Sequence, residues 1–542
     1  MRNRWSAGLT VATACSLILA GCSKGEPVKS SNETSRPSPS AAPSSTAPDA
    51  QGKKYKGEIV VSINADPNAH LEKAFDAVAE AYKKVQPDVK LIWEPGGSTE
   101  YAKWLGTQLA VGTPRPDIVS SNYQENYARY VNLDKYRKKV NPYTGNKWDQ
   151  DIDFDFYAAR NAKGERIMLP TQAVHIMWFY NKDIFDKLGL KPPKTWDELV
   201  SVSEKIKASG VTPIATQFGW KLNAWLPEIY ADQYARNWHE IVRAQKGDYN
   251  YDDALDGAFK FDPKDPQIDL KYNYNPVRFY KGIKDGTIRF DTPQFTNWIA
   301  NLAKVFPKYA QQDVFVTNDN SDYTLWLQQK AAMFIDGTRS LSVITKDMQN
   351  LNDPKRLEAL KIKDAGALKP FAWGTFENPE MTGAGVQGPV RSVESSAGQY
   401  IGIIDKNQEQ TNMVADFTMF WLSKAGYQAW IDGQEKAGIL SLSGPLVIRG
   451  VNLPDDVKNI FKDVKMLGNA EIPMNNILMD GGVKDLETEM RSNFKDALEG
   501  KMSAEEFGKK LQALYTNNFN QIITNAGLTP DNIDHPEKAP GK

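Results

Sequence analysis

The chain has 542 residues, of which 41% are hydrophobic and 25% are charged, and its formal net charge is −1. Its length is sufficient for more than one domain. Because basic and acidic side chains balance, the composition argues against nucleic acid or anionic lipid as a partner. The 14 Trp, 22 Tyr and 22 Phe are either core residues or the flat rings that a carbohydrate site requires.

Residues 1–21 are predicted to be a lipoprotein signal peptide. Arg2 and Arg4 supply positive charge, and an apolar run from Leu9 to Gly21 is too short to cross a bilayer. The run ends in Leu-Ala-Gly-Cys at 19–22, which resembles a bacterial lipobox, so Cys22 is the expected site of lipidation, with palmitate as one acyl group. An ordinary secretory signal with a chance cysteine is the alternative. Cys15 would leave with the signal, so the mature body would contain no free thiol.

Residues 22–52 are predicted to be the lipidated cysteine followed by a disordered tether. From Ser23 to Gly52, 17 of 30 residues are Ser, Pro or Ala. Such a segment buries too little apolar surface to offset its ordering entropy. As a flexible chain it would span roughly 30 Å and hold the body close to a membrane surface.

The first part of the body alternates strand and helix patterns. Apolar, β-branched runs predict strands at 58–63, 89–93 and 117–120, and helical spacing of apolar residues predicts helices over 69–85 and 101–109. This β-α-β-α-β order predicts an α/β fold with a mostly parallel sheet.

A second alternating set begins near Pro170. Thr195 and Glu198 form a Thr-x-x-Glu capping box, and Gly210 ends the helix that follows. Other strands are predicted at 174–180, 213–216, 332–335 and 400–404, and other helices at 182–188, within 295–330, at 413–431 and at 504–523. The polar residues from about Leu528 onward are predicted to be frayed.

Three segments of this body resemble the bacterial extracellular solute-binding proteins of the sugar type (family 1), which serve ABC importers. They are 168–217, with Tyr-Asn-Lys-Asp at 180–183 and Thr-Trp-Asp-Glu-Leu at 195–199; 327–344; and 399–422. The resemblance implies a periplasmic-binding-protein-like fold of two α/β lobes joined by a hinge. Lobe 1 would comprise 53–172 and 397–440, and lobe 2 would comprise 173–396 and 441–542. Ligand would bind between the lobes, at the carboxyl ends of the strands, and closure would signal to the permease.

Candidate ligand-binding residues follow from position after the strands and from side-chain chemistry. They are Asn64, Glu94, Asn122, Tyr123, His175, Trp178, Gln217, Trp220, Asp336, Arg339 and Trp373. Asn64 and Asn122 are equally explained as turn or helix-cap residues, and Trp178 as a core residue. Trp220, in a Gly-containing loop, is the favoured platform for stacking on a sugar, against ordinary packing. Trp373 is placed after a strand.

Arg339 leaves the ligand's charge open. Sugar binders of this family often carry an aromatic residue where this chain has Arg339. Its guanidinium could pair with the carboxylate of an acidic sugar, hydrogen-bond two hydroxyl groups, or pair internally with Asp336.

Signals for catalysis or cofactors fail on inspection. Gly-x-Gly-x-x-Gly at 383–388 matches a dinucleotide fingerprint, but Pro389 follows it and no clear strand precedes it. The alternating aspartates at 149–155 lack the glycine and final acid of a calcium loop. The four histidines are scattered, with no His-Glu-x-x-His, and no Gly-x-Ser-x-Gly occurs. No catalytic residue, metal or cofactor is predicted.

The sequence therefore predicts a lipid-anchored, extracytoplasmic substrate-binding component of an ABC importer. Its ligand would be a carbohydrate, most simply an oligosaccharide, captured by closure of two lobes without chemistry. The expected partners are the ABC permease subunits and the membrane through the lipid anchor only, with no nucleic acid and a monomeric body. The alternatives are a surface glycan-active enzyme, which needs paired carboxylates, and the ligand-presenting component of a sugar sensor.

Overall fold

The computed structural model describes residues 53–64, 70–94, 96, 101–120, 129–154, 156, 159–161, 165–316, 321–351, 353–363, 368–395, 400–471, 481 and 483–541. The predicted signal peptide, Cys22 and the tether lie outside these ranges, and so do Asn122 and Tyr123. Within these ranges, no helix combines the length and the apolar character needed to cross a bilayer.

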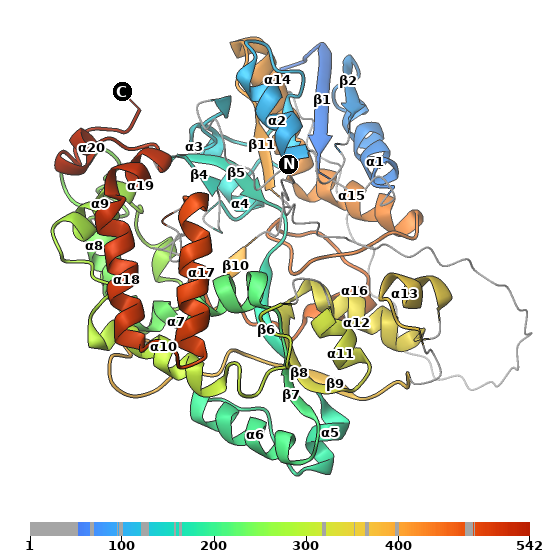
Figure 1. Ribbon diagram of the computed structural model, residues 1–542. Coiled ribbons are helices and arrows are strands. Elements are labelled where there is room, and N and C mark those ends of the chain that lie inside the picture. The colour runs from blue at the N-terminus through green and yellow to red at the C-terminus, as the bar shows by residue number, and fades with distance from the viewer. Residues whose placement is uncertain are drawn as a thin grey trace, which may run out of the picture.

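The first lobe is built on a sheet of order β2-β1-β3-β11-β5-β4 (Figure 1). Its strands are β1 (Gly57–Ile63), β2 (Val89–Trp93), β3 (Ile118–Ser120), β4 (Ala159–Arg160), β5 (Arg166–Pro170) and β11 (Tyr400–Ile403). β1 pairs in parallel with β2 and β3, whereas β11 runs antiparallel to β3 and β5. The chain thus returns to this lobe after about 230 residues in the second one, as strand numbers 5 and 11 in one sheet require.

Helices cover this sheet because their apolar residues recur at helical spacing. The buried residues Ala74, Phe75, Val78 and Tyr82 form one face of α1 (Glu72–Lys83), which packs against α15 (Lys424–Lys436). The remaining helices of this lobe are α2 (Tyr101–Ala110), α3 (Asp134–Arg137), α4 (Trp148–Asp151) and α14 (Gln408–Trp421).

The second lobe is built around β6 (Val174–Asn181), which is buried along almost its whole length. It pairs antiparallel with β8 (Ala331–Gly337), β9 (Trp373–Phe376) and β10 (Glu394–Ser395), and β8 pairs in parallel with β7 (Thr212–Ala215). In both sheets most pairings are antiparallel, so the predicted mostly parallel sheets are wrong in this detail, although the two-lobed α/β class is confirmed. The physical reason is that β6 and β11 enter their sheets from the junction of the lobes, so β6 runs against β8, and β11 runs against β3 and β5.

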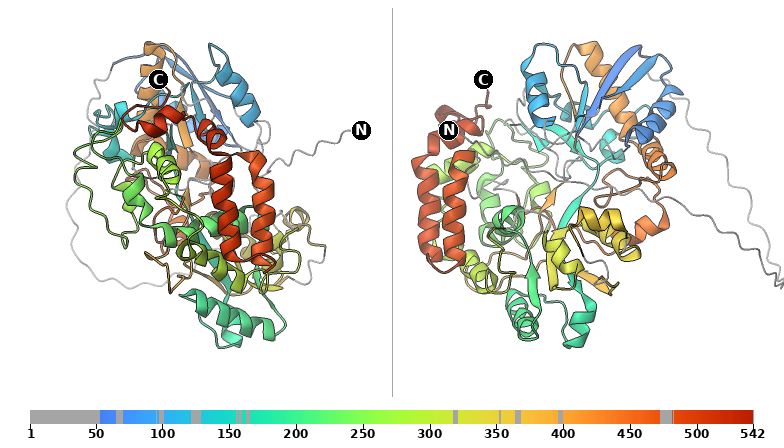
Figure 2. Two further views of the ribbon diagram at one scale, coloured as in Figure 1. Left: turned by 60° about the vertical axis from the view of Figure 1, so that its left-hand side comes forward. Right: turned by 45° about the vertical axis from the view of Figure 1, so that its right-hand side comes forward.

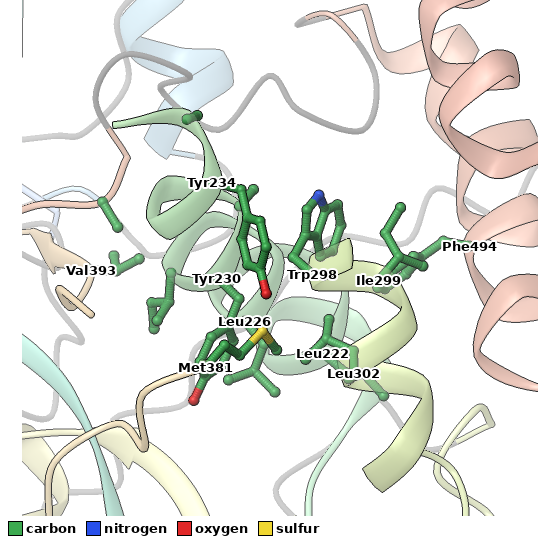
Figure 3. Close-up of a cluster of buried hydrophobic side chains, with 14 of the residues drawn as sticks. Leu222, Leu226, Tyr230, Tyr234, Trp298, Ile299, Leu302, Met381, Val393 and Phe494 are labelled. Atoms are coloured by element: carbon green, nitrogen blue, oxygen red, sulfur yellow. The ribbon is translucent and has the colours of Figure 1, made fainter. Parts of the chain in front are cut away.

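Helices surround the second sheet, and a buried apolar cluster joins them. Figure 3 shows Leu226 and Tyr230 on one side and Trp298 and Leu302 beside them, with Phe494 beyond Ile299. The helices are α5 (Lys182–Lys187), α6 (Trp196–Ala208), a π-helix (Phe218–Trp225), α7 (Leu226–Ala235), α8 (Trp238–Val242), α9 (Pro276–Lys284), α10 (Pro293–Val305), α11 (Ser321–Leu327), α12 (Arg339–Gln349), α13 (Pro354–Ala359), α16 (Asp455–Phe461), α17 (Lys484–Leu498), α18 (Ala504–Asn517), α19 (Phe519–Asn525) and α20 (Pro530–Asp534). α17 and α18 stand side by side on the outside of this lobe (Figure 2).

Two described segments join the lobes and pair with each other. Residues 171–173 lead from β5 to β6, and 443–449 pass between the lobes near the C-terminal third of the chain. Gln172 bridges Leu446, and the Ala173 N–H donates to Pro445 O at 2.8 Å. Gly444 lies so close to this crossing that a Cβ there would stand 1.7 Å from Ala173 O. Only glycine therefore allows the two segments to pack at this spacing.

Three predictions about helices need correction. The predicted helix 413–431 is interrupted at Ser423, whose hydroxyl caps α15 at the Gly426 N–H, 3.5 Å away. The predicted helix 504–523 is likewise divided at Asn518. The end of the chain is ordered and not frayed, because Thr529 and Asn532 form a capping box and Ile533 is fully buried.

Other local predictions are confirmed. The capping box of Thr195 and Glu198 begins α6, and Leu199, Val202 and Ile206 form its buried face. The strands predicted at 58–63, 89–93, 174–180 and 332–335 are present within one or two residues of the predicted ends. The Gly-containing loop predicted after β7 is instead the π-helix 218–225.

A fully buried charged network holds the segment that leads back toward the first lobe. Arg391 donates from Nη2 to Asp232 Oδ1 at 2.7 Å and is also paired with Asp269. Arg236 donates from Nη2 to the other oxygen of Asp232 at 2.6 Å. His239 Nε2 lies 3.2 Å from Arg391 Nη2, which can only donate, so this nitrogen accepts and the imidazole is neutral.

This network predicts loss of stability in mild acid. Burial lowers the pKa of His239 to about 4, and the Arg391 charge also lowers it, against the opposing effect of Asp232. The unfolded chain takes up a proton on this residue near pH 6.5 and the folded chain only near pH 4, so stability present above pH 6.5 is lost as the pH falls through this window. We expect the free energy of unfolding to drop by roughly 3 kcal/mol from this residue. Urea denaturation at a series of pH values measures it.

The matched variant is His239→Gln, which keeps an oxygen that can accept from Arg391. Its free energy of unfolding should vary less between pH 6.5 and pH 4 than that of the native chain. An unchanged slope in this variant would assign the acid sensitivity to other groups.

Candidate ligand-binding site

A buried lysine lies between two aspartates at the carboxyl end of the second sheet. Lys221 Nζ is 2.5 Å from Asp322 Oδ2 and 3.1 Å from Asp336 Oδ2, and the exposed fraction of the lysine side chain is 2%. Lys221 comes from the π-helix, Asp322 from α11 and Asp336 from the end of β8. The ammonium group thus joins three elements that follow or flank neighbouring strands β7 and β8.

The three groups adjust one another's protonation. Burial by itself lowers the pKa of the Lys221 amine, but the two carboxylates outweigh burial and hold the pKa above its usual value. Burial raises the pKa of Asp336, yet the charges of Lys221 and Arg339 reverse this and bring the pKa to about 2. Burial dominates at Asp322 and raises its pKa. Lys221 and Asp336 are therefore both charged at neutral pH.

Arg339 extends this cluster toward solvent. It is the first residue of α12, and both Nε and Nη2 lie 3.4 Å from Asp336 Oδ1. The internal pairing considered from the sequence therefore exists, but its distances are long, and 37% of the arginine side chain is exposed. The exposed part of the guanidinium can contact a ligand while Asp336 orients it.

Trp220 and Gln217 come from the segment that follows β7, close in sequence to Lys221. Trp220 precedes Lys221 in the π-helix and, at 43% exposed, is one of the few large apolar side chains exposed among the described residues. Gln217 precedes the π-helix at the end of β7 and is 8% exposed. A π-helix is often associated with a functional site, because it changes the direction of side chains within one turn.

His175 and Trp178 lie on β6 and are both fully buried. His175 Nε2 is 2.6 Å from Glu377 Oε2, and the Glu377 side chain, 30% exposed, brings this pair to the surface. Trp178 stacks on Phe376 and donates from Nε1 to Asn378 Oδ1 at 3.2 Å. Of the two interpretations of Trp178, its burial favours the core residue.

The prediction that Trp373 follows a strand is wrong, because Trp373 is the first residue of β9. It is half-buried and its ring lies 6.3 Å from that of Phe179. β9 pairs with β6 in a register that places Trp373 opposite Asn181, at the end of β6 away from His175. The structure therefore separates Trp373 from the cluster around Lys221.

The first lobe contributes fewer described candidates. Asn64 is exposed and bridges Gly96 directly after β1. Glu94 follows β2 and is held by Arg115, with 2.5 Å between Oε1 and Nη2. Both lie at the carboxyl ends of parallel strands, as predicted, and the roles of all these residues in binding remain predictions.

Sequence reasoning missed Lys221, Asp322 and Glu377. Lys221 directly follows the favoured Trp220, and its apolar surroundings in Phe-Gly-Trp-Lys-Leu were the available signal. Nothing local marks Asp322 or Glu377, because their partners are 101 and 202 residues away.

The motifs that resemble enzyme sites have structural roles. Gly388 packs against Pro263 O in a loop, so the 383–388 motif does not open a helix. Asp149 pairs with Arg137 and Lys138, and Asp151 accepts a hydrogen bond from Asn141 at 2.8 Å.

Comparison with known proteins gives the family. Residues 68–428 match the bacterial extracellular solute-binding proteins. An uncharacterised ABC transporter extracellular-binding protein of Pyrococcus horikoshii is 30% identical over 157 residues, which are 27% of this chain and 34% of that protein. The sn-glycerol-3-phosphate-binding periplasmic protein UgpB of Yersinia pestis is 28% identical over 203 residues, or 35% of this chain and 43% of that protein. The chain therefore spans less than half the length of these curated relatives.

Solved structures agree in fold. A family 1 extracellular solute-binding protein from Bifidobacterium longum subsp. infantis has a TM-score of 0.52 at 18% identity, covering 85% of this chain and 99% of that one. A cyclic alpha-maltosyl-1,6-maltose binding protein from Arthrobacter globiformis has a TM-score of 0.51 at 15% identity, covering 85% and 99%. The chain belongs to the family of bacterial extracellular solute-binding proteins, and it has their two-lobed fold.

The buried lysine yields a stability prediction. Lys221→Met would leave the carboxylates of Asp322 and Asp336 buried without their cation, so we expect the free energy of unfolding to fall by about 3–5 kcal/mol. Chemical denaturation measures this change. Lys205→Met, on the exposed side of α6, is the control and should stay within about 0.5 kcal/mol of the native chain. Equal effects of the two substitutions would contradict the ion-pair assignment.

Proposed function

We propose that this protein is the substrate-binding component of an ABC importer and that its ligand is a neutral carbohydrate, most simply an oligosaccharide. The observation that carries the proposal is the edge formed by Lys221, Asp336 and Arg339, where Asp336 orients a partly exposed guanidinium. Trp220, which directly precedes Lys221 in the π-helix, has an exposed side chain. A flat ring suits the apolar face of a sugar, and the guanidinium suits its hydroxyl groups. Membership in the family supports the importer and an extracytoplasmic location.

The charge balance at this edge favours a neutral ligand. The cations Lys221 and Arg339 are matched by Asp322 and Asp336. Glu377, which is paired with the buried His175, adds a further carboxylate near this edge. The carboxylate of an acidic sugar would compete with Asp336 for the charge of Arg339 and lie close to a second carboxylate, so hydroxyl groups are the better partners.

Closure of the lobes is the mechanism we infer for capture. The paired segments 171–173 and 443–449 are the described connections that would bend. Thr338, next to Arg339, donates from Oγ1 to Ser443 O at 2.8 Å, so the ligand edge is directly bonded to one connection. A solute contacting Arg339 and the first lobe together would favour the closed arrangement. No bond in the solute is made or broken.

The proposal is tested by calorimetry and thermal shift on the chain from Ser23 onward, which contains every described residue. Neutral oligosaccharides should bind, raise the melting temperature and be recovered unchanged. At 100 times its Kd, a ligand stabilises the fold by about 2.7 kcal/mol. Uronic-acid oligosaccharides and sn-glycerol-3-phosphate form the anionic arm. Binding in that arm alone would contradict the neutral class, and a cleaved product would favour the glycan-active enzyme.

Single substitutions measure the separate contributions of Arg339 and Trp220 to ligand affinity. Arg339→Ala should weaken binding of a neutral sugar roughly 10- to 100-fold through lost charged hydrogen bonds. Trp220→Ala should cost about tenfold, because a truncated Trp contact typically costs more than 1 kcal/mol. Arg289→Ala, which removes an arginine paired with Asp291 elsewhere in this lobe, is the control and should leave Kd unchanged. Native affinity in both edge variants would exclude this edge as the site.

We also propose that Cys22 carries the lipid that anchors the protein. The support is the sequence Leu-Ala-Gly-Cys after an apolar run, with a tether between it and the body. Cys22→Ser should release the protein from the membrane fraction and abolish incorporation of radiolabelled palmitate, while ligand affinity stays unchanged. Continued labelling of this variant would place the lipid elsewhere or identify an ordinary secretory signal.

A further inference from the structure

The near-zero net charge of the chain conceals an uneven distribution on the first lobe. Six exposed lysines gather where the body begins, and we call them, together with Val140, the basic face. The lysines are Lys53, Lys54, Lys83, Lys84, Lys139 and Lys147. None of the six forms an ion pair among the described residues.

Contacts with a group of tyrosines bring these lysines together. Lys53 Nζ lies 5.0 Å from the centroid of the Tyr55 ring, and Lys139 Nζ lies 4.1 Å from that of Tyr136. Each ammonium group therefore sits over an aromatic face and remains open to solvent on its other side.

The end of α1 is tied to the same place. Lys54 Nζ donates to Val85 O at 2.7 Å, directly after Lys83 and Lys84. Gln86 then donates from Nε2 to Lys53 O at 2.9 Å and to the Tyr143 hydroxyl at 3.3 Å. The start of the body, the end of α1 and the loop around residue 143 thus form one surface.

Neighbouring acids do not cancel this charge. Asp149 is already paired with Arg137 and Lys138, and Glu58 with Lys90. The other acids nearby are the exposed Glu80, one helical turn before Lys83, and the exposed Asp88, Asp405 and Glu409. Asp416 is buried beneath the face, where it accepts hydrogen bonds from Tyr82 and Gln86. The six exposed lysines outnumber the four exposed acids, so the solvent-facing charge of the basic face is positive.

An exposed apolar side chain lies among the lysines. Val140 is 62% exposed, follows Lys139 and forms a bridge with Lys147. An apolar tip between lysines matches the interfacial region of a bilayer, where lysines meet headgroups and their stems lie along apolar surface.

The basic face lies at the opposite end of the first sheet from the candidate ligand residues. β1 begins beside it at Gly57 and ends before Asn64, a distance of roughly 20 Å for seven residues. In Figure 1 the arrow of β1 points from this end toward the second lobe. Cys22, the proposed site of lipidation, precedes Lys53 by 31 residues in the sequence.

We propose that the basic face rests on the anionic surface of the membrane and holds the protein with its ligand edge directed outward. The headgroups attract the lysines within about a Debye length, and Val140 enters the interfacial region. As a flexible chain, the predicted tether of residues 23–52 would span roughly 30 Å and keep the face within reach of that surface. The protein would collect solute in this orientation and must leave it to present its ligand edge to a partner in the membrane. This contact is separate from ligand binding and from the proposed permease.

Vesicle sedimentation tests the contact with the unacylated chain from Ser23 onward, so that a lipid anchor plays no part. The protein should pellet with phosphatidylcholine vesicles containing roughly one-third phosphatidylglycerol at low salt, and not with phosphatidylcholine alone. Replacing Lys53, Lys54, Lys139 and Lys147 together by Gln should lower the partition at least about tenfold. Replacing Lys187, Lys191, Lys194 and Lys205 on the second lobe is the matched control and should change it less than about twofold.

Orientation is tested by labelling, because the chain after Cys22 contains no cysteine. A fluorophore on Val140→Cys should be quenched by headgroup quenchers in anionic vesicles, whereas one on Val343→Cys, in α12 next to the ligand edge, should not. Equal loss of binding in both lysine variants, or quenching at 343 alone, would overturn the proposal. Binding to a soluble polyanion but not to vesicles would also overturn it and assign the face to an anionic polymer.

Discussion

The proposed ligand edge depends on the two ion pairs of Lys221. The ammonium group is buried, so its charge is tolerated only because Asp322 and Asp336 lie within hydrogen-bonding distance. By pairing with both, it fixes the π-helix against α11 and the end of β8. Asp336 in turn orients Arg339, so an exposed group that can bind a ligand is positioned by a buried one that cannot reach it. The carboxylates of Asp322 and Asp336 balance the charges of Lys221 and Arg339. For this reason the Arg339 guanidinium suits the hydroxyl groups of a ligand better than a carboxylate.

The second constraint is the pairing of the two connections between the lobes. Gly444 allows residues 443–449 to lie against 171–173, and Thr338 bonds this connection to the start of α12. The residue that follows Thr338 is Arg339. The proposed ligand edge is therefore one residue away from the hydrogen bond to the connection 443–449. Leu442, Val447 and Ile448 belong to the same buried apolar cluster as Ile59 of β1 and Phe334 of β8. The lobe closure proposed above would therefore act on packed side chains at this connection, which is a condition for two discrete arrangements rather than a continuous range.

Charged side chains are unevenly distributed in this protein, and the net charge does not reveal this. The second lobe buries Arg236 and Arg391 against Asp232 and Asp269, where they hold the chain that returns to the first lobe. In the first lobe, by contrast, the lysines of the basic face form no ion pairs with other described residues, and they lie where the described body begins. A net charge of −1 argues against general attraction to polyanions, but attraction at short range depends on the charges within about a Debye length of the contact.

The sequence by itself determined the local elements and the class of fold. Apolar spacing placed β1, α1, β2 and β6, and Thr195 with Glu198 placed the start of α6, because these signals act between residues close together in the chain. The motifs at 168–217 pointed to the family, and Trp220 and Arg339 were named as candidate ligand residues from their places in the sequence. Only the tertiary structure decided the direction of the pairings between strands, the interruption at Ser423, the burial of Trp178 and the displacement of Trp373 from the edge. It alone brought Lys221 to Asp322 and Asp336, and Glu377 to His175, because each pair joins segments more than 100 residues apart and no local pattern records a contact between distant residues.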